Sequence, residues 1–234
     1  MTEHNRIEHN QEEQIITAIE AQRRPGRYNL SINGEYAFSV HEDIVVKYRL
    51  LKGVVITDRL RQDVLAEEEI NAAYRSAIRY IGRAMRSSQE VRVKLKDKGY
   101  NEASINVVIQ RLVEQRYIDD EVYASALARQ RIRSNKKGPL WVRRELSQKG
   151  IDQTSVEQAM TQFNKSDEYD QALELASKRW RSIKGELPDR IRKIMSLLQR
   201  RGYTSDTIRK VTQQLRINNT DESTDWEDQE LLET

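Results

Sequence analysis

A short motif occurs three times in the sequence, as LKDKGYN at residues 95–101, LSQKGID at residues 146–152 and LQRRGYT at residues 198–204. Each copy has a leucine four residues before a glycine, a basic residue directly before it, and a residue that can cap a helix two residues after it. The glycines lie 51 and 52 residues apart. A fixed period of this length is typical of repeat proteins.

The positions around Gly99, Gly150 and Gly202 follow the period of an α-helix. Apolar residues recur eight and four residues before each glycine, and six, nine and thirteen residues after it. Glycine readily takes the left-handed conformation that ends a helix. The motif therefore predicts a helix that ends at the glycine and a second helix that begins two residues later. The apolar positions are Val91, Leu95, Ile105, Val108 and Leu112; Val142, Leu146, Val156, Ala159 and Phe163; and Ile194, Leu198, Ile208, Val211 and Leu215.

A further helix is predicted before each pair from a tyrosine followed three residues later by an alanine. These two positions are one helical turn apart, so we place both on the packing face. We expect Asp119-Asp120 and Ser166-Asp167 to supply N-terminal capping in the second and third copies. The pairs are Tyr74 and Ala77, Tyr123 and Ala126, and Tyr169 and Ala172.

The predicted fold is therefore mainly α, with three tandem three-helix repeats at residues 67–118, 119–165 and 166–218. A single unit of this size is small, and stacked units usually share interfaces, so we expect an elongated, curved stack. Residues 219–234 contain no Lys or Arg and seven Asp or Glu, and lose the helical period. They are predicted to form a solvated acidic tail, with Trp226 as an anchor.

A small α/β domain is predicted over residues 15–66, after a disordered arm at residues 1–14. Asn33-Gly34 lies between two segments of alternating apolar and polar residues, which is the strongest short signal for a hairpin. Together with Ile15–Ala21, these segments predict an antiparallel sheet of about three strands. A short helix from Glu42 to Leu51, ended by Gly53, and a further helix capped by Thr57 are expected to pack on the sheet.

Charge is distributed unevenly along the chain, although the net charge is only +3. Residues 67–218 carry 31 Lys or Arg against 20 Asp or Glu, a surplus of 11, whereas residues 1–66 are nearly balanced with 9 against 10. A basic body is typical of proteins whose partner is rich in phosphate. The alternative is a set of solvated helix faces whose charges pair along each helix.

Catalytic motifs are missing from the sequence. The chain has no cysteine, and its three histidines all lie within the first 41 residues, so the repeats offer no thiolate, no histidine-based metal site and no Ser-His-Asp arrangement. No glycine-rich phosphate loop is present. We therefore expect no enzymatic activity, no metal and no cofactor. No apolar run is long enough for a membrane span, and residues 1–14 do not look like a signal or transit peptide, so we expect a cytoplasmic protein.

Basic residues instead gather at one place in each repeat, near the end of its first helix. The same location in successive repeats would give a basic stripe that can follow a phosphate backbone. The alternative is that these side chains complement helix C-termini and form surface ion pairs. The clusters are Arg79, Arg83 and Arg86 in the first repeat; Arg129, Arg131, Arg133, Lys136 and Lys137, followed by Trp141, Arg143 and Arg144, in the second; and Lys178, Arg179, Trp180 and Arg181 in the third.

Two tryptophans, Trp141 and Trp180, accompany these clusters. Beside a basic stripe their rings could stack on bases, which contributes about 1–3 kcal/mol per base. Large aromatic side chains at helical spacing more usually pack between helices, and that alternative stays open. The tight helix pair around each glycine also resembles a DNA-reading helix-turn-helix, but helix hairpins are common structural units.

Several segments resemble the RecX family. The resemblance covers about residues 67–163, is weaker in the third repeat, where it rests on residues 198–203 and the flanking helices, and extends to the N-terminal region, which is similar to the extension of the Gram-positive branch. The matching segments are RSSQEVRxKL at residues 86–95, KGY at 98–100, IxxL at 109–112, YIDDExYA at 117–124, KGP at 137–139, VRREL at 142–146, KGI at 149–151 and SVHED at 39–43.

The resemblance implies a bacterial regulator of the RecA recombinase, acting in homologous recombination, DNA repair and the SOS response. Members of the family bind the RecA filament on single-stranded DNA, lie in its helical groove, lower its ATPase and strand-exchange activities, and promote its disassembly or block its growth. The family brings no catalytic residues. We expect a monomer whose partners are the RecA filament and single-stranded DNA, and whose second and third repeats make the main contacts.

Two other functions fit a basic helical-repeat protein. A helix-turn-helix regulator of duplex DNA would bind two half-sites as a symmetric dimer, and the unequal tandem repeats in one chain count against it. A protein-interaction scaffold that never touches DNA would bind its partner in a manner that survives nuclease and depends weakly on salt. Contact with single-stranded DNA predicts a steep salt dependence instead, with a slope of about −0.7 per neutralised phosphate.

Overall fold

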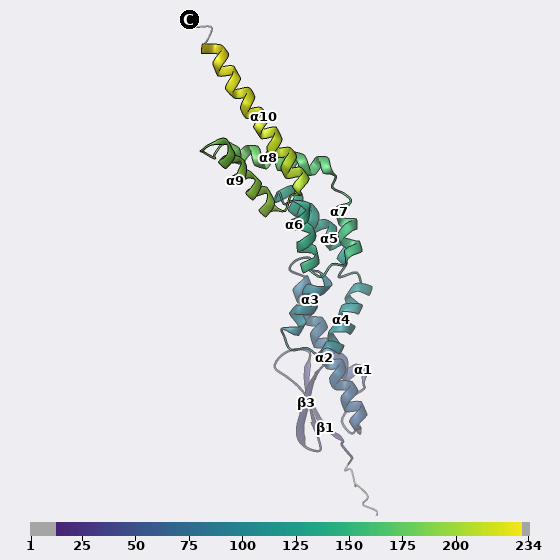
Figure 1. Ribbon diagram of the computed structural model, residues 1–234. Helices are drawn as coiled ribbons and strands as arrows, with labels where there is room; N and C mark the ends of the chain where they lie inside the picture. Colours follow the sequence, from purple (N-terminus) through teal and green to yellow (C-terminus); the bar gives the residue numbers. More distant parts are fainter. Residues whose placement is uncertain (1–12, 231–234) are drawn as a thin grey trace, which may run out of the picture. The chain divides into compact units, whose positions relative to one another are not determined.

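The computed structural model describes residues 13–230, with side chains for residues 13–218 (Figure 1). The chain forms two compact units. The first holds the residues up to Arg83 together with Arg92–Leu112, and the second holds Ala84–Val91 together with the residues from Val113 onward. The predicted arm at residues 1–14 lies almost wholly outside the described residues. Among the helices that are described, none combines the length and the hydropathy needed to cross a membrane.

In the first unit, the described N-terminal residues form a three-stranded antiparallel sheet in the order β1-β2-β3. The strands are β1 (Ile16–Ala21), β2 (Arg27–Ile32) and β3 (Glu35–His41). Asn33 and Gly34 have φ angles of 51° and 90°, so both take the left-handed conformation that a two-residue hairpin turn requires. The predicted hairpin is thus confirmed, and one face of the sheet forms a core with Ile16, Leu30 and Val40 fully buried.

The helix that follows the sheet is shorter than predicted. Helix α1 (Glu42–Lys47) ends six residues before Gly53, with Tyr48 as its cap. Arg49 takes the left-handed conformation there, with a φ angle of 47°. The prediction that Gly53 ends this helix is therefore wrong. Glycine is the usual residue for a left-handed helix end but not the only one, and sequence alone did not point to Arg49.

Helix α2 (Asp58–Ile81) begins at the predicted cap, because the hydroxyl of Thr57 accepts a hydrogen bond from the amide of Leu60. The helix runs without a break through residues 66 and 67, where the sequence suggested a domain boundary. Its first half holds the sheet, since the carboxylate of Glu68 accepts from the Arg27 guanidinium. Its second half belongs to the first repeat. One helix thus serves both parts of the first unit.

Each repeat consists of three helices within the described residues (Figure 1), which confirms the predicted fold class. In repeats 2 and 3 the three helices pack on one another around separate buried cores. The helices are α2, α3 (Ser88–Lys96) and α4 (Glu102–Glu114) in repeat 1; α5 (Asp120–Arg129), which continues into the π-helix η1 (Gln130–Ser134), α6 (Pro139–Gln148) and α7 (Gln153–Met160) in repeat 2; and α8 (Lys165–Trp180), α9 (Leu187–Arg201) and α10 (Ser205–Glu230) in repeat 3.

The motif glycines have the predicted role. Gly99, Gly150 and Gly202 have φ angles of 84°, 76° and 83°, and the next residue in each copy donates its amide to the carbonyl of the motif leucine. The following cap is also confirmed in all three copies. The side-chain oxygens of Asn101, Asp152 and Thr204 each accept a hydrogen bond from the amide three residues further on.

The predicted packing face of the first helix is confirmed in part. Ala77, Ala172 and Tyr123 are buried, but Ala126 is exposed. A position that is fully buried in all three repeats lies 26 residues before the motif glycine, at Ala73, Ala124 and Ala176. This position follows from the fixed spacing to the motif glycines, whereas the spacing from the tyrosines to the glycines varies between repeats.

Two ends in repeat 3 also differ from the prediction. Helix α8 is capped by Asn164, whose side-chain oxygen accepts from the amide of Asp167 at 2.7 Å, and not by Ser166-Asp167. Helix α10 continues to Glu230, so its backbone is helical beyond residue 218, where the third repeat was predicted to end, and through most of the predicted solvated acidic tail. The change in composition at residue 219 is therefore a change of charge and not the end of the helix. Residues 231–234 lie outside the described part.

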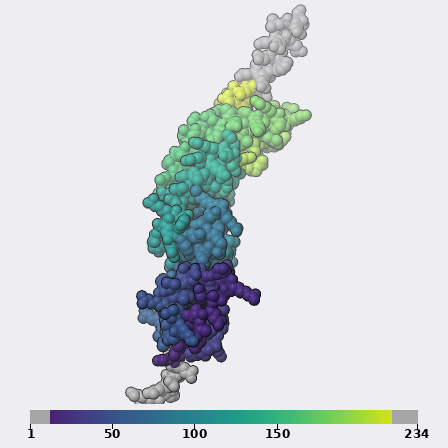
Figure 2. All heavy atoms as spheres, turned by 180° about the vertical axis from the view of Figure 1, so that it is seen from behind, coloured from purple at the N-terminus to yellow at the C-terminus, as the bar shows by residue number. Residues whose placement is uncertain are grey.

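Repeats 2 and 3 join through a backbone contact between two helix ends and form one continuous surface (Figure 2). The amide of Gly138 donates to the carbonyl of Arg201 at 2.8 Å, and that of Leu140 to Gly202 at 3.0 Å. The first amides of α6, which a helix leaves without internal partners, are thus bonded to the last carbonyls of α9. A Cβ atom at Gly138 would lie 2.3 Å from the backbone of Gly202. The close approach therefore requires a residue without a side chain.

The first turn of α3 meets the end of α6 in a similar way, within the second unit. The hydroxyl of Ser87 donates to the carbonyl of Lys149 at 2.7 Å, and the Lys149 ammonium lies 2.6 Å from the carboxylate of Glu90. A Cβ atom at Gly150 would lie 2.4 Å from the Cβ of Gln89. Gly150 and Gly202 thus combine a left-handed turn with a close approach to the neighbouring helix.

Candidate nucleic-acid interface

The basic residues predicted to bind a nucleic acid fall into two groups, which the sequence does not distinguish. Arg131 belongs to the first group. Its guanidinium forms two hydrogen bonds with the carboxylate of Glu145, at 2.8 and 2.9 Å, and both side chains are largely buried. The hydrogen bond to Glu145 raises the pKa of Arg131 above its usual value. Arg131 therefore joins η1 to α6, and its positive charge is already paired with the carboxylate of Glu145.

Other predicted residues are also engaged within the protein. Lys136 pairs with Glu174 at 2.8 Å, Arg143 pairs with Glu157, and Arg86 lies 3.6 Å from Glu90. Two more donate to neutral groups, Arg129 to the side chain of Gln162 and Arg179 to the hydroxyl of Ser182. These residues therefore form ion pairs and hydrogen bonds within the protein, which is the alternative to a role in binding a nucleic acid.

The second group is exposed and without an ion pair or hydrogen bond to any described residue. It comprises Arg79, Arg83, Arg133, Arg144, Lys178 and Arg181. Arg133 and Arg144 belong to repeat 2, and Lys178 and Arg181 to repeat 3, so these four lie in the second unit. Arg79 and Arg83 belong to the first unit. A basic stripe that runs through all three repeats therefore stays a prediction. Four of the exposed basic residues without a described partner nevertheless belong to one compact unit.

The two tryptophans are partly buried and pack against the cores of their repeats. Trp141 lies against the core of repeat 2, with the Lys137 ammonium 4.1 Å from its ring centroid. Trp180 lies against the core of repeat 3, with the Arg190 guanidinium 3.8 Å from its ring centroid. A cation over an aromatic ring is a favourable contact, and it occupies one face of the ring. This is the arrangement expected if the tryptophans join helices.

The π-helix η1 could not be predicted from the sequence. The amide of Asn135 donates to the carbonyl of Gln130, five residues earlier, and Lys136 then takes a φ angle of 51°. Single π-helical turns often occur at functional sites. This wider turn carries Arg131, which faces Glu145, and Arg133, which is exposed and free among the described residues.

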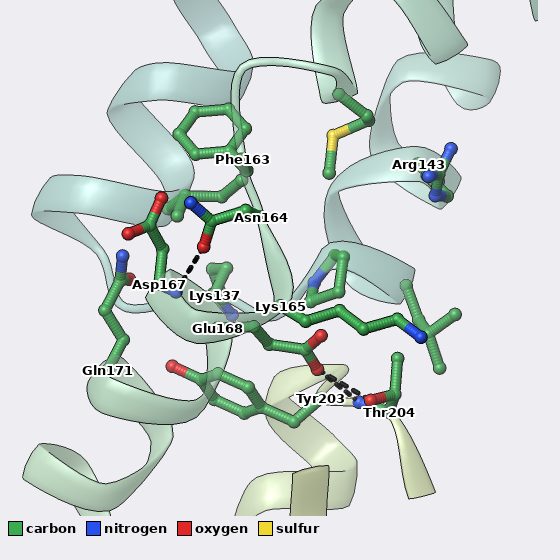
Figure 3. A pocket seen from close by; sticks show the side chains of 14 residues that line it. Lys137, Arg143, Phe163, Asn164, Lys165, Asp167, Glu168, Gln171, Tyr203 and Thr204 are labelled. Atoms are coloured by element: carbon green, nitrogen blue, oxygen red, sulfur yellow. Dashed lines mark hydrogen bonds between the residues drawn. The ribbon is translucent and has the colours of Figure 1, made fainter. Parts of the chain in front are cut away.

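A cavity of about 220 Å³ lies between repeats 2 and 3 and was also not predicted (Figure 3). Its apolar lining includes Ile132, Met160 and Phe163, and Tyr203 lies at its other side. Burial raises the pKa of the Tyr203 hydroxyl to about 12. The lining residues come from four segments between residues 132 and 204, so no local motif marks the cavity. No group of His, Cys, Asp and Glu in the described residues is arranged to hold a metal ion.

Four family models match the chain, and all describe RecX. They are the RecX N-terminal domain at residues 14–57 and the first, second and third RecX three-helix domains at residues 73–112, 119–160 and 166–212. The matched ranges contain the three-stranded sheet and most of the described helices.

Individual relatives agree with these models. A protein named regulatory protein RecX from Halalkalibacterium halodurans is 36% identical over 219 residues, which cover 91% of this chain and 82% of that relative. A crystal structure of a regulatory protein RecX superposes with a TM-score of 0.69 at 30% identity, covering 86% of this chain and 99% of the other. A crystal structure of RecX from Lactobacillus salivarius gives a TM-score of 0.57 at 27% identity over 64% of this chain and 99% of the other. The sequence motifs, the three-helix repeats and these matches agree, and the chain belongs to the RecX family of regulatory proteins.

Proposed function

We propose that this protein binds the RecA filament on single-stranded DNA and inhibits its ATPase, its strand exchange and its growth. It acts by binding, as a cytoplasmic monomer, in recombination, DNA repair and the SOS response. The proposal rests on the match to four RecX family models, the N-terminal domain followed by the first, second and third three-helix domains.

Exposed basic residues of the second unit support the proposal that the protein contacts DNA in the filament. Arg133, Arg144, Lys178 and Arg181 are exposed and lack partners among the described residues. Such cations can neutralise phosphates without breaking an internal ion pair, and each phosphate contact releases counterions from the nucleic acid. Several weak contacts in one unit also gain from a high effective concentration once the first has formed. We therefore assign the DNA contact to these four residues, and not to Arg131, Lys136 or Arg143.

The proposal is tested by co-sedimentation of the protein with preassembled filaments of the cognate RecA on single-stranded DNA. The variant Arg133→Glu/Arg144→Glu should bind the filament at least tenfold more weakly than the unaltered protein, because attraction to phosphate is replaced by repulsion at two sites. The matched control is Arg192→Glu/Arg209→Glu. It makes the same change in net charge at two exposed arginines of repeat 3 whose present partners are the neighbouring aspartates Asp189 and Asp206. This control should bind nearly as well as the unaltered protein.

The two other functions give different results in the same assay. A scaffold that never touches DNA would bind RecA equally in the presence and absence of DNA, and neither double variant would matter. A duplex-reading regulator would bind double-stranded DNA of one sequence and ignore the filament. Absence of any binding to the filament would overturn the proposal.

A further inference from the structure

A groove of about 720 Å³ runs along the first half of helix α10 in repeat 3, beside α9 and the first turn of α6. Leu140 and Met195 line it and are 53% and 46% exposed. The α10 residues that line it recur at helical spacing over three turns, so the groove follows one face of that helix. They are Ser205, Ile208, Arg209, Thr212, Gln213 and Arg216. A long, partly apolar groove of this kind suits a second helix laid along it.

The half of α10 that lines the groove is basic. Residues 205–216 carry three Lys or Arg against one Asp. The single carboxylate, that of Asp206, pairs with both Arg209 and Lys210, at 2.7 and 2.9 Å, and all three side chains are exposed. One negative charge shared by two cations leaves a positive surplus beside the groove. An occupant with negative charge is therefore favoured.

The other half of the same helix has the opposite charge. Residues 219–230 carry six Asp or Glu and no Lys or Arg. In Figure 1 this part of α10 runs beyond α8 and α9, and the last buried residue among the described side chains of the helix is Leu215. Negative charges at the C-terminal end of a helix oppose its dipole, and like charges one turn apart, such as Asp221 and Asp225, repel each other. A short helical segment is also marginal in water without packing. A cationic surface outside this segment would therefore stabilise it.

We propose that two copies of the free protein associate through α10, and that the acidic half of each helix lies in the basic groove of the other. Residues 219–230 are as many as residues 205–216, and at 1.5 Å per residue each half is about 18 Å long. An antiparallel pair with its twofold axis between residues 217 and 218 therefore places each acidic half along the other groove. Because the contact is reciprocal, it closes at two copies.

The acidic half also continues the spacing of the face that lines the groove. The positions that follow on the same face are residues 219, 220, 223, 226, 227 and 230, which include Trp226, Glu227 and Glu230. In the antiparallel pair, position 226 comes opposite Arg209. A tryptophan beside a guanidinium is a favourable pairing of an aromatic ring with a cation. This register gives Trp226 the role of an anchor, as expected from the sequence, and places Glu227 next to it.

Other occupants match the groove less well. A nucleic acid would suit the charge of Arg209 but would leave the exposed apolar surface of Leu140 and Met195 without a partner. A basic peptide would be repelled. The acidic half of the same copy cannot fold back into its own groove, because α10 is helical without a break to Glu230. The monomer remains the form proposed to act on the filament, so filament binding does not depend on this dimer.

Sedimentation velocity of the full chain, over a series of concentrations at low and high salt, tests the dimer. The unaltered protein should form dimers and no larger species, and its dissociation constant should rise with salt, which screens the charges. Met195→Glu should weaken the dimer about tenfold or more, because it places a carboxylate beside the acidic helix. The matched control Met195→Lys should associate at least as tightly as the unaltered protein. Both should keep the melting temperature, since Met195 is 46% exposed.

A charge exchange identifies the occupant of the groove. Glu227→Lys alone should weaken the dimer about tenfold, because it brings a positive charge to the basic groove. The combination Met195→Glu/Glu227→Lys should restore most of the affinity, since the two introduced charges attract each other across the interface.

Four results would overturn the inference. A monomer at every concentration at low salt would show that no second copy fills the groove. Equal dimers of Met195→Glu and Met195→Lys would place the interface elsewhere. No restoration in the combined variant would exclude the acidic half as the occupant. Species that grow beyond the dimer would show an open contact instead of a closed pair. None of these measurements contains RecA, so their failure is distinguishable from failure of the proposed function.

Discussion

At the scale of single residues, the structure separates basic side chains that look equivalent in the sequence. Arg131 and Arg133 lie two residues apart in one cluster, yet one is tied to Glu145 and the other has no described partner. The partner carboxylate is 14 residues away in the next helix, and the π-helical turn decides which arginine faces it. The cluster could be predicted from the sequence, but the free members could not.

This difference predicts that two alanine substitutions change the stability by different amounts. Arg131→Ala should lower the free energy of unfolding by about 1–3 kcal/mol, because it leaves the largely buried carboxylate of Glu145 without its donor. Arg133→Ala should change it by less than about 0.5 kcal/mol, as is usual for an exposed side chain without partners. Urea denaturation of the two variants measures both values. Equal losses would show that the pairing of Arg131 with Glu145 does not stabilise the fold.

At the scale of helices, the repeats depend on contacts between the end of one helix and the beginning of another. Gly138 at the start of α6 lies against Gly202 at the end of α9, and Gly150 lies against Gln89. Gly99 has open space around the position of a Cβ atom. The three motif glycines therefore share a left-handed turn, but only two of them also allow a close approach.

Substitution of Gly138 tests the close approach at the junction. Gly138 has a φ angle of −75°, which alanine adopts without strain, so Gly138→Ala should destabilise only because its Cβ would lie 2.3 Å from the backbone of Gly202. We expect a loss of about 2–4 kcal/mol, as for other overpacked or disrupted contacts. Gly99→Ala is the comparison, and it should lose only about 1–2 kcal/mol from its left-handed φ angle. Thermal melts rank the two, and a smaller loss at Gly138 would contradict the described junction.

Glu90 gives the junction at α3 a dependence on pH. Burial raises the pKa of Glu90, but hydrogen bonds from Lys149, the Ser87 amide and Tyr123 outweigh it, so the pKa lies below its usual 4.5. A lowered pKa in the folded state contributes stability that is present above about pH 4.5 and is lost as the pH falls through the folded-state value. Glu90→Gln should therefore be less stable than the unaltered protein at pH 7.

The stability difference between these two proteins should shrink as the pH falls below 4.5. Urea denaturation at pH 7, 5 and 3.5 measures it. A difference that stays constant over this range would mean that the charge of Glu90 does not contribute to the junction.

Much of this helical organisation was predictable, for local reasons. The glycines, their caps and the buried positions of the second and third helices follow from rules that act within a few residues. The π-helix, the continuation of α10 to Glu230 and the cavity were not predicted. The π-helix and the cavity depend on contacts between segments far apart in the sequence, and a helix can continue where the hydrophobic period stops.

At the scale of the whole molecule, the charge of the repeats agrees with the proposed contact with DNA. Residues 67–218 carry a surplus of 11 positive charges, followed by seven acidic residues at the C-terminal end. The repeat signature and the motif strings around Gly99 and Gly150 are specific enough that the amino-acid sequence alone indicates the family. The stacking of the repeats into an elongated, curved body stays a prediction, as does their placement in the groove of a filament.

The proposed inhibition of the RecA filament can be measured through the single-stranded-DNA-dependent ATPase of the cognate RecA, titrated with the protein. We predict that the ATPase rate falls at substoichiometric amounts of the protein, since an action on filament growth or breakage affects many RecA subunits for each molecule bound. An unchanged ATPase rate and filament length at saturating protein would contradict the account.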